Sequence, residues 1–326
     1  MPKQISITKE TVVGVLMGGL SPESKISMKS GQAVSKALKE KGYNIVDIVV
    51  DRNLHQKLIE HKVEVAWIAL HGIYGEDGCV QGVLELLGIP YTGSGVRACA
   101  ISMNKNSTKR AIQHRDVQLI KDTRWNSAQP FPNWSVPLVI KDPMGGSSIG
   151  VWVCLDQTAL ESAITECQKL GGIFLVEEYV GGIEITVPIL QGEAFPVITI
   201  VPKNAFFDID AKYTKGQTEY LAPTPGSIIA ASSNIPESIA KDAQRQAIEV
   251  FEELGMRGVA RADFIVPCVG KHPNITIAPN TRPVFLEINA IPGMTETSLT
   301  PMSASVLGLS FADVTEKILL HAQCDL

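Results

Sequence analysis

Short apolar runs alternate with amphipathic stretches in the N-terminal part of the chain. The apolar runs that predict buried strands are 12–17, 44–50 and 65–70. Apolar side chains at helical spacing predict a helix from about Ser24 to Lys41, with Gly42 as the residue after its end. A second helix is predicted through 80–87 and ends at Gly88. This alternation is typical of a small parallel α/β sheet, which binds ligands at the carboxyl ends of its strands.

Two loops would lie at that edge of the sheet, GGLSPESK after the first strand and HGIYGEDG after the third. The first lacks the GxGxxG spacing of dinucleotide-binding proteins, and the chain has no GxxxxGK[ST] phosphate-binding loop. Glu23 is either a ligand-binding residue or an acidic group that favours the start of the following helix. His71 stands at a strand end before a glycine, which favours a site residue over a core histidine.

A second unit is predicted from about Ser94. A helical stretch around 100–115 leads to a proline- and tryptophan-containing loop, and then to a strand at 137–141 that ends in Lys141. The next segment, DPMGGSSIG, is a glycine- and serine-rich turn between two strands. Such a turn either wraps a phosphate with its backbone N–H groups and hydroxyls or simply joins a hairpin. A helix is predicted over 157–170.

The remaining chain is predicted to be α+β. GIFLVEEYVGGIEITV predicts a strand, a break and another strand, and the break exposes the backbone donors and acceptors that an adenine ring needs. The polar loop at 208–226, which contains Lys212 and Tyr213, is predicted to be a lid. The next helix is predicted to have Pro236 at its first helical position and to end before Gly255.

Two predicted strands, in the segments RADFIVP and VFLEIN, carry charged and amide side chains among apolar ones. Because strand side chains alternate between faces, Arg261 and Asp263 share one face of their strand, and Glu287 and Asn289 share one face of theirs. If the strands pair as a hairpin, these groups meet on one surface and offer oxygen ligands that suit Mg²⁺ bound to a nucleotide. The plain alternative is two exposed faces with an ion pair. The apolar neighbours favour the metal, because carboxylates packed together near a core repel without a cation.

Composition narrows the classes of function. A chain of 326 residues is too long for one core and suggests two or three domains. The net charge is only −5 and no Lys/Arg-rich run occurs, so binding to nucleic acid or to an anionic membrane is not expected. The polar N-terminal segment does not read as a signal peptide, and no apolar run approaches a membrane span. Six scattered cysteines indicate reduced, mostly buried thiols in a cytoplasmic protein.

Several separated motifs resemble those of the ATP-grasp ligases, and most closely those of the D-alanine–D-alanine ligase family. In chain order they are GGLSPESKIS, ALHGIYGEDGCVQGVLELLGIPYTGSG, IKDPMGGSSIG, VEEYVGGIEITV, DAKYTKGQTEY, ARADFIV and LEINAIPGMTETSLTPM. The match covers essentially the whole chain. It implies an ATP-grasp fold of α/β and α+β class, with an N-terminal parallel α/β domain at 1–93, a central subdomain at 94–176 and a C-terminal subdomain at 177–326.

The resemblance implies which residues bind ATP and metal. Lys105 and Lys141 would neutralise the α- and β-phosphates, and the turn at Gly146, Ser147 and Ser148 would close over the nucleotide. Glu178 and Val180 would bind adenine through their backbones, and Glu184 would bind the ribose hydroxyls. The other implied nucleotide-binding residues are Glu177 and Lys212. The residues implied to hold two Mg²⁺ or Mn²⁺ ions are Asp263, Glu287 and Asn289.

The resemblance also implies the reaction, which is the ATP-dependent joining of two D-alanine molecules for peptidoglycan precursors. The carboxylate of the first D-alanine would take the γ-phosphoryl group, and the amine of the second would attack the acyl phosphate. Arg261 and the N–H of Gly293 would stabilise the tetrahedral oxyanion. The residues implied to bind the two substrates are Glu23 and His71 for the first and Ser298 and Leu299 for the second. Ser147, Tyr213 and Glu23 would form a hydrogen-bonded triad that links the lid to the substrates.

Several positions depart from the family's pattern. Ser24 stands where a basic residue is usual, Asn104 where aspartate is typical, Asp142 where proline is common and Ala290 where threonine is usual. About ten extra residues, around VGKHPNITIAPN, lengthen the connection between the two metal-ligand strands. None of these changes removes a charge that the mechanism requires, although Ser24 bears on selectivity for the first substrate. Tyr213 favours an amino acid as acceptor, because relatives that use D-lactate have a histidine in the lid.

Three rival functions can be compared with this interpretation. A sister ligase with another donor or acceptor, such as D-serine, would be separated by product analysis. A nucleotide-binding regulator without turnover is disfavoured, because every lysine, arginine and metal ligand that turnover needs is present. A Rossmann-type dehydrogenase is disfavoured by the missing glycine spacing. The family predicts a homodimer whose small-molecule partners are ATP and two D-alanine molecules.

Overall fold

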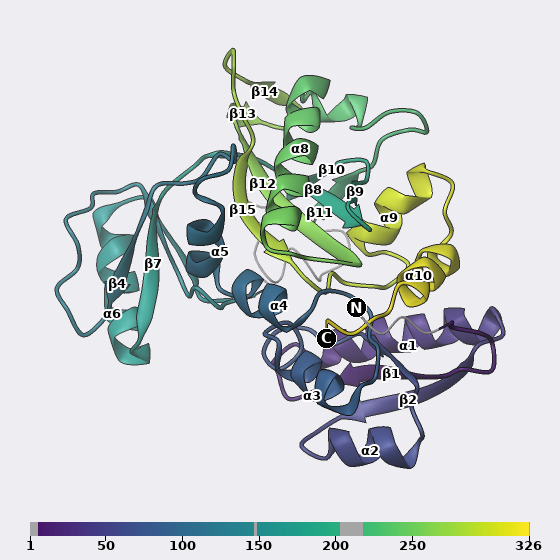
Figure 1. Cartoon of the computed structure of the whole chain (residues 1–326). Coiled ribbons are helices and arrows are strands. Elements are labelled where there is room, and N and C mark those ends of the chain that lie inside the picture. Colours follow the sequence, from purple (N-terminus) through teal and green to yellow (C-terminus); the bar gives the residue numbers. More distant parts are fainter. Residues whose placement is uncertain (1–5, 147–148, 203–217, 326) are drawn as a thin grey trace.

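The structure is a computed structural model that describes residues 6–146, 149–202 and 218–325 (Figure 1). Its N-terminal part is a parallel sheet with the strand order β2-β1-β3. The elements of this part are β1 (Val12–Gly18), α1 (Ser24–Glu40), β2 (Asn44–Val50), α2 (Leu54–Glu60), β3 (Val65–Ile68) and α3 (Cys79–Leu87). The predicted strands and helices are confirmed. Helix α2 is not predicted, because it is short and its buried residues, Leu54 and Leu58, make too brief a periodic pattern.

The carboxyl ends of β1 and β3 carry the two loops that the sequence singles out. Gly42 and Gly88 end the helices α1 and α3 as predicted, with φ angles of +87° and +64° that favour glycine. After β1, the Ser21 hydroxyl donates a hydrogen bond to the backbone carbonyl of His71 at 2.7 Å. This bond joins the GGLSPESK and HGIYGEDG loops at one edge of the sheet.

A four-stranded antiparallel sheet with the order β4-β7-β5-β6 forms the second part, at the left of Figure 1. Its elements and the two helices before it are α4 (Val96–Ser102), α5 (Lys105–Ile112), β4 (Asp122–Asn126), β5 (Leu138–Lys141), β6 (Val151–Cys154), α6 (Gln157–Leu170) and β7 (Ile173–Glu178). Helix α6 covers one face, where Leu160 and Cys167 share a core with Trp125 and Phe174. The turn predicted between two strands is the β5–β6 connection.

The helical stretch predicted around 100–115 is two helices instead of one. Asn104 separates α4 from α5, because its backbone is extended (φ −104°, ψ 106°). Its side-chain oxygen accepts a hydrogen bond from the Ser107 N–H at 3.0 Å, which is the geometry of an N-cap. Asparagine therefore retains the capping function that an aspartate would have at this position, and it fixes Lys105 as the first residue of α5.

A larger sheet with the order β11-β10-β8-β12-β15 forms the third part, and β9 pairs with β8 at its side. Its elements are β8 (Gly182–Leu190), β9 (Glu193–Ala194), β10 (Ile198–Pro202), β11 (Thr218–Leu221), the 3-10 helix η1 (Ala231–Ser233), α8 (Glu237–Glu253), β12 (Val259–Pro267), β13 (Val269–Lys271), β14 (Asn274–Thr276) and β15 (Val284–Asn289). Helix α8 lies across one face of this sheet in Figure 1 and buries Ala243, Ala247 and Val250 against it. The extra residues between the two metal-ligand strands include the hairpin β13–β14.

Two predictions for this part need correction. The polar loop predicted at 208–226 contains strand β11, which pairs with β10 because Thr218 and Tyr220 continue the ladder of that sheet edge. Residues 203–217, including Lys212 and Tyr213, lie outside the described residues. Pro236 is the N-cap of α8 and not its first helical residue, because its ψ of 140° is extended.

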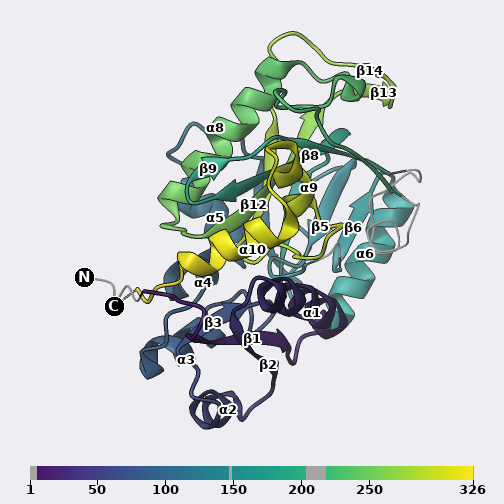
Figure 2. The same ribbon diagram turned by 90° about the vertical axis from the view of Figure 1, so that its right-hand side faces the viewer.

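Two C-terminal helices, α9 (Leu299–Val306) and α10 (Phe311–Leu320), complete the fold. Both figures of the whole chain place α10 beside α1, so the C-terminal end returns to the N-terminal sheet (Figure 2). Val314 and Ile318 of α10 share a core with Val34 and Leu38 of α1. The two helices bury apolar side chains against each other, a contact between distant segments that no local pattern in the sequence reveals.

Replacing Lys41 with methionine is expected to lower the melting temperature by about 2 °C at neutral pH. The Lys41 ammonium, just after α1, pairs with Asp313 at 2.8 Å and with Glu316 at 2.7 Å on α10. Hydrogen bonds from Lys41 lower the pKa of Glu316 to about 2 and hold the pKa of Asp313 below its usual range. A carboxylate whose pKa is lower in the folded state stabilises the fold above its unfolded pKa, here 4.5 for Glu316, and loses that effect as the pH falls to about 2.

The difference in melting temperature between the wild type and Lys41→Met should therefore shrink as the pH falls through this range. Thermal unfolding followed by circular dichroism across a pH series measures it. Lys36→Met is the matched control, because Lys36 lies on the same helix and its ammonium is 3.9 Å from Glu40 on an exposed face. A difference that stays constant at every pH would contradict the role given to these ion pairs.

The thiols and helices agree with two further expectations. The structure records no disulfide among the described residues, and four of the six cysteines, Cys99, Cys154, Cys167 and Cys324, are buried. No helix in the described parts of the chain has the length and apolar character needed to cross a membrane.

Candidate active site

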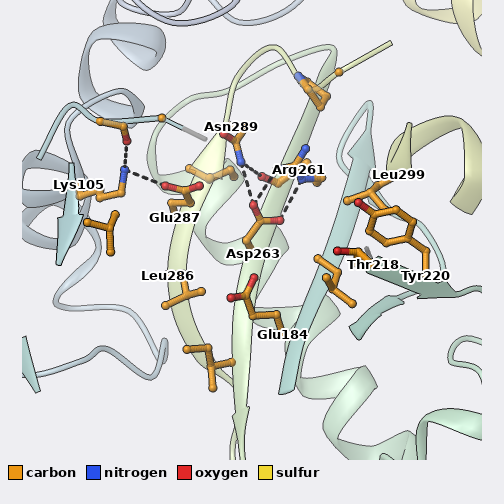
Figure 3. Close-up of a pocket in the computed structure, with 18 of the residues that line it drawn as sticks. Lys105, Glu184, Thr218, Tyr220, Arg261, Asp263, Leu286, Glu287, Asn289 and Leu299 are labelled. Carbon is orange, nitrogen blue, oxygen red and sulfur yellow. Dashed lines mark hydrogen bonds and ion pairs between the residues drawn. The ribbon is translucent and has the colours of Figure 1, made fainter. Parts of the chain in front are cut away.

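A cleft of about 1650 Å³ lies where the three parts of the fold meet. Its walls come from the loop before α1, the start of α5, the β5–β6 turn, strands β7, β8, β11, β12 and β15, and the start of α9. Figure 3 shows part of this wall, with Lys105, Glu287, Asp263, Arg261 and Asn289 directed to one region. Ordinary small-molecule pockets measure about 300–1,000 Å³, so the cleft has room for several ligands at once.

Strands β12 and β15 carry the polar floor of this cleft. They pair antiparallel, with Arg261 opposite Asn289 and Asp263 opposite Glu287, so the hairpin pairing predicted from side-chain alternation is confirmed. Arg261 donates to both oxygens of Asp263, from Nε at 2.9 Å and from Nη2 at 2.8 Å. Asp263 also accepts from the Thr186 hydroxyl at 2.5 Å and from the Asn289 amide at 3.1 Å. These bonds fix the orientation of the Asp263 carboxylate.

The donor groups on this floor fit a hard divalent cation. Asp263 and Glu287 offer carboxylates and Asn289 offers a carboxamide oxygen on paired positions of adjacent strands. Within the described residues, no group of three His, Cys, Asp or Glu side chains is placed to enclose a metal. Mg²⁺ commonly binds through one or two carboxylates and completes its coordination with phosphates and water. The geometry therefore suits a metal that binds together with a nucleotide. The ion pair between Arg261 and Asp263, which was the simpler explanation of these residues, is also present.

Lys105 reaches the same floor from the start of α5. Its ammonium pairs with Glu287 Oε2 at 2.8 Å and donates to the Gly145 carbonyl at 2.6 Å (Figure 3). Burial alone would lower the pKa of Lys105, but the carboxylate of Glu287 outweighs it and the pKa is raised. The Lys105 backbone N–H also donates to the Pro143 carbonyl at 2.9 Å. These contacts tie the lysine to both the polar floor and the β5–β6 turn.

Lys141, at the end of β5, pairs with a buried carboxylate instead of the floor. Its ammonium lies 2.6 Å from Glu177 Oε2, and the other oxygen of Glu177 accepts from Lys109 of α5. Glu177 is only 1% exposed. Burial alone would raise its pKa, but Lys141 and Lys109 outweigh this effect and the pKa of Glu177 is lowered. The carboxylate is therefore ionised at neutral pH between two cations.

The predicted adenine and ribose residues line the cleft beside the break between β7 and β8. Glu178 ends β7, and its backbone N–H donates to the Lys121 carbonyl at 3.1 Å. Val180 lies in the break itself. Glu184 of β8 stands opposite Ile265 of β12, and Figure 3 shows its carboxylate just beyond Asp263.

The β5–β6 turn closes the cleft from the side of the four-stranded sheet. Asp142 donates its backbone N–H to the Gly150 carbonyl at 2.7 Å, a bond that the proline common in the family cannot make. Its carboxylate accepts from the Met144 N–H at 2.9 Å. Gly146 lies close to Glu23, because a Cβ at Gly146 would stand 3.3 Å from Glu23 Oε2. The turn therefore approaches the loop after β1, and Ser147 and Ser148 of the turn lie outside the described residues.

His71 is buried and bonds to protein groups through both ring nitrogens. Its Nε2 lies 3.1 Å from the Ser30 hydroxyl, and its Nδ1 lies 3.1 Å from the Ile291 carbonyl and 3.5 Å from Glu76. Because a carbonyl can only accept, Nδ1 carries a proton. His71 thus joins α1, β3 and the loop after β15, and its predicted contact with substrate stays a prediction. Burial raises the pKa of Glu76, which also lines the cleft.

The loop between β15 and α9 forms the remaining wall. Ser298 is the N-cap residue of α9, and its hydroxyl accepts from the Thr295 N–H at 2.9 Å. A Cβ at Gly293 would lie 3.3 Å from that hydroxyl, so Gly293 and Ser298 are neighbours across the loop. Leu299 is the first helical residue, and a backbone N–H at this position has no partner within the helix. Such an N-terminus suits a carboxylate.

Sequence reasoning missed several residues that hold the site together, namely Ser30, Glu76, Lys109 and Thr186. Two of them carry a signal that is visible afterwards. Lys109 follows Lys105 by four positions, which places both lysines on one face of α5. Thr186 follows Glu184 by two positions in a strand, which places both on the cleft face of β8. The partners that give these residues a role lie on other elements, so spacing alone does not identify them.

Two family models match the chain. Residues 52–94 match the D-ala D-ala ligase N-terminus, and residues 111–320 match the D-ala D-ala ligase C-terminus. A D-alanine–D-alanine ligase of Syntrophotalea carbinolica is 41% identical over 314 residues, which cover 95% of this chain and 95% of that protein.

Solved structures agree with the sequence relatives. The D-alanine–D-alanine ligase of Bacillus anthracis has a TM-score of 0.77 and 30% identity, and the match covers 94% of this chain and 96% of that chain. A second structure from Bacillus anthracis, described as complexed with ATP, has a TM-score of 0.76 and 28% identity, with the same coverage. The similarity therefore extends over the N-terminal sheet, the four-stranded sheet and the larger sheet together.

Proposed function

This chain belongs to the D-alanine–D-alanine ligase family, and from that premise we propose that its cleft joins two D-alanine molecules to D-alanyl-D-alanine as ATP becomes ADP and phosphate. The dipeptide is a precursor of peptidoglycan. One observation carries the proposal: the lysines, the arginine and the paired carboxylates that such a reaction needs line one cleft in a chain 41% identical to a ligase of this family. ATP as co-substrate agrees with the related structure complexed with ATP.

The nucleotide is proposed to lie between the four-stranded sheet and the larger sheet. Lys105 and Lys141 would meet its phosphates, because both ammoniums line the cleft and are held there by carboxylates. The residues proposed for the adenine and ribose are Glu178, Val180 and Glu184, and Glu177 is a further residue proposed for the nucleotide site. The residues proposed to close over the phosphates, which include positions outside the described residues, are Gly146, Ser147, Ser148 and Lys212.

Two Mg²⁺ or Mn²⁺ ions are proposed to bind through Asp263, Glu287 and Asn289, which fit such ions as described above. When bound, the ions would reduce the negative charge of the phosphates and so allow an anionic nucleophile to approach. Arg261 pairs with Asp263 and Lys105 pairs with Glu287, so both carboxylates are held in place by a cation.

The chemistry is proposed to take two steps in this cleft. An oxygen of the first D-alanine's carboxylate attacks the γ-phosphorus, the bond from that phosphorus to ADP breaks, and an acyl phosphate forms. The amine of the second D-alanine then attacks the acyl carbon, and phosphate leaves as the peptide bond is completed. Arg261 and the N–H of Gly293 would stabilise the oxyanion of the tetrahedral intermediate, and the cleft supplies mainly positioning and charge neutralisation.

The two amino acids are proposed to occupy opposite sides of Arg261. Glu23 would pair with the ammonium of the first D-alanine, with His71 behind it, and a triad of Glu23, Ser147 and Tyr213 would connect this subsite to the lid. Ser298 and the Leu299 N–H would bind the carboxylate of the second D-alanine, which agrees with their place at the start of α9.

Replacing Ser298 with alanine is expected to raise the KM for the second D-alanine about tenfold, because a hydrogen bond to a charged group is lost. The KM for ATP and the KM for the first D-alanine should change little. Initial rates measured against D-alanine and fitted to two successive binding steps separate these constants. Ser305→Ala is the matched control on the same helix, since the Ser305 hydroxyl bonds only its own helix at the Met302 carbonyl. If the KM for the second D-alanine does not change in Ser298→Ala, Ser298 does not bind the second D-alanine.

Assembly, domain limits and location are further proposals. We propose a homodimer and a cytoplasmic location, because the family resemblance implies both. We propose domains at 1–93, 94–176 and 177–326, and the three separate sheets support this division, except that β7 of the four-stranded sheet continues to Glu178. Helix α10 is an exception within it, because it packs on α1 of the first domain.

Phosphate release with ATP, Mg²⁺ and D-alanine tests the function, with L-alanine and no amino acid as controls and mass analysis of the product. Release that requires D-alanine, together with the dipeptide mass, is expected. A mixed product when D-serine is added as a competing acceptor would favour the sister-ligase alternative. ATP binding with no release for any amino acid would contradict the function and favour a regulator.

A further inference from the structure

We propose that Lys109 is a positioning residue for nucleotide binding: it holds one oxygen of Glu177, so that Lys141 can leave that carboxylate for the phosphates of ATP. The inference rests on the proposed function, because it takes Lys141 to be a phosphate-binding residue. Lys109 itself would touch neither the nucleotide nor the substrates. Its effect would pass through Glu177.

The contacts of Lys109 leave it no donor for a ligand. Its side chain is 6% exposed, and its ammonium pairs with Glu177 Oε1, with Asp122 Oδ2 at 2.9 Å and with the Ile120 carbonyl at 3.1 Å. An ammonium has three N–H donors, so these three acceptors use all of them. Lys109 is also not among the residues that line the main cleft, whereas Lys105, Lys141 and Glu177 line it.

Glu177 is shared by two cations with different access to the cleft. Its Oε1 forms an ion pair with Lys109, and its Oε2 lies 2.6 Å from the ammonium of Lys141, which lines the cleft. The Glu177 side chain is 1% exposed, so water cannot take the place of a lost partner. Removing one partner of a buried ion pair is costly because the other charge is left uncompensated. With Lys109 present, Lys141 can turn to a phosphate and Glu177 still has a counter-ion.

Without Lys109, Glu177 and Lys141 would form an exclusive buried pair. ATP would then have to separate that pair and leave a carboxylate unpaired, so nucleotide binding should weaken. The chemical step should be nearly unaffected, because the partners of Lys109 are Glu177, Asp122 and the Ile120 carbonyl, and not Arg261 or Asp263. The expected signature is therefore a change in the KM for ATP with little change in kcat.

Lys109→Met is expected to raise the KM for ATP about tenfold and to leave kcat and the KM for D-alanine within about twofold. In a Glu177→Gln background no carboxylate can trap Lys141, so the same Lys109→Met change should alter the KM for ATP by less than about twofold. Arg110→Met is the matched control, because it removes a cation from the next, exposed position of α5. Lys109→Arg should restore most of the ATP affinity by keeping a cation beside Glu177.

Several results would overturn the inference. A tenfold effect of Lys109→Met in both backgrounds would mean that Lys109 does not act through Glu177. An equal effect of Asp122→Asn would assign the role to the Lys109–Asp122 pair, and a loss confined to kcat would point to general damage of the fold. If Lys109→Met does not fold, Lys109→Gln is compared in the two backgrounds with the same criterion. Wild-type protein that releases no phosphate with D-alanine would refute the proposed function instead, so that assay is done first.

Discussion

Replacing Glu287 with glutamine should lower kcat by about 1000-fold or more and leave the fold intact. Glu287 stands opposite Asp263 in the β12–β15 pair, and its carboxylate is one of two in the proposed metal set. Glutamine keeps the shape but removes the charge, so the ions would bind weakly and the phosphates would repel the attacking carboxylate. The side chain is 24% exposed, and its partner Lys105 retains the Gly145 carbonyl, so stability should change little.

The measurement is ADP formation with D-alanine at a series of Mg²⁺ and Mn²⁺ concentrations, with thermal unfolding of the same samples. The activity that remains should need more metal than the wild type needs, because one ligand is weaker. Glu252→Gln, on the exposed side of α8, is the control for the loss of a negative charge. A kcat within about tenfold of the wild type, with the same metal dependence, would remove Glu287 from the metal site.

Replacing Arg261 with lysine should lower kcat by about 100-fold and change the KM for ATP little. Arg261 holds both oxygens of Asp263, at 2.9 Å and 2.8 Å, and it is proposed to stabilise the tetrahedral oxyanion. Lysine keeps the charge but has a single nitrogen, so it cannot hold a carboxylate through two parallel bonds and also face the oxyanion. The loss should therefore fall on the step that forms the peptide bond.

Rapid-quench measurements separate that step from the first. In Arg261→Lys, ADP should form in a burst that is followed by slow dipeptide formation, because the acyl phosphate waits for the amine. Arg124→Lys, at an exposed position of β4, is the matched control. Equal rates of ADP and dipeptide formation, close to those of the wild type, would refute an oxyanion role for Arg261.

The parts of the fold that sequence predicts well are those with local patterns. The parallel strands of the N-terminal sheet are continuous apolar runs, and helix α6 has a clear apolar face with the glycine Gly171 at its end. Helix α10 is different, because its apolar face is covered by α1, nearly three hundred residues earlier in the chain. Strand β11 is polar, with Thr218 and Glu219, and its place is set by pairing with β10 and not by its own composition.

In the candidate site, too, local patterns predict some features, whereas contacts between distant elements set the others. Side-chain alternation correctly predicts that Asp263 and Glu287 stand opposite each other, because the strands that carry them pair antiparallel and their register is continuous from Arg261 to Asp263, before it shifts at Phe264. The bond from Thr186 to Asp263 and the two lysines on Glu177 depend on contacts between separate elements. Chemical type identifies the charged residues of such a site, whereas their partners follow only from the packing of the sheets.

The most direct test of the central claim follows an oxygen atom through the reaction. D-alanine labelled with ¹⁸O in its carboxylate is incubated with ATP, Mg²⁺ and the protein, and the phosphate is analysed by mass spectrometry. If the carboxylate attacks the γ-phosphorus and the amine then displaces phosphate, each phosphate released with a dipeptide carries one ¹⁸O from D-alanine. Dipeptide formed together with unlabelled phosphate would contradict the acyl-phosphate route, and unlabelled phosphate without dipeptide would contradict ligation itself.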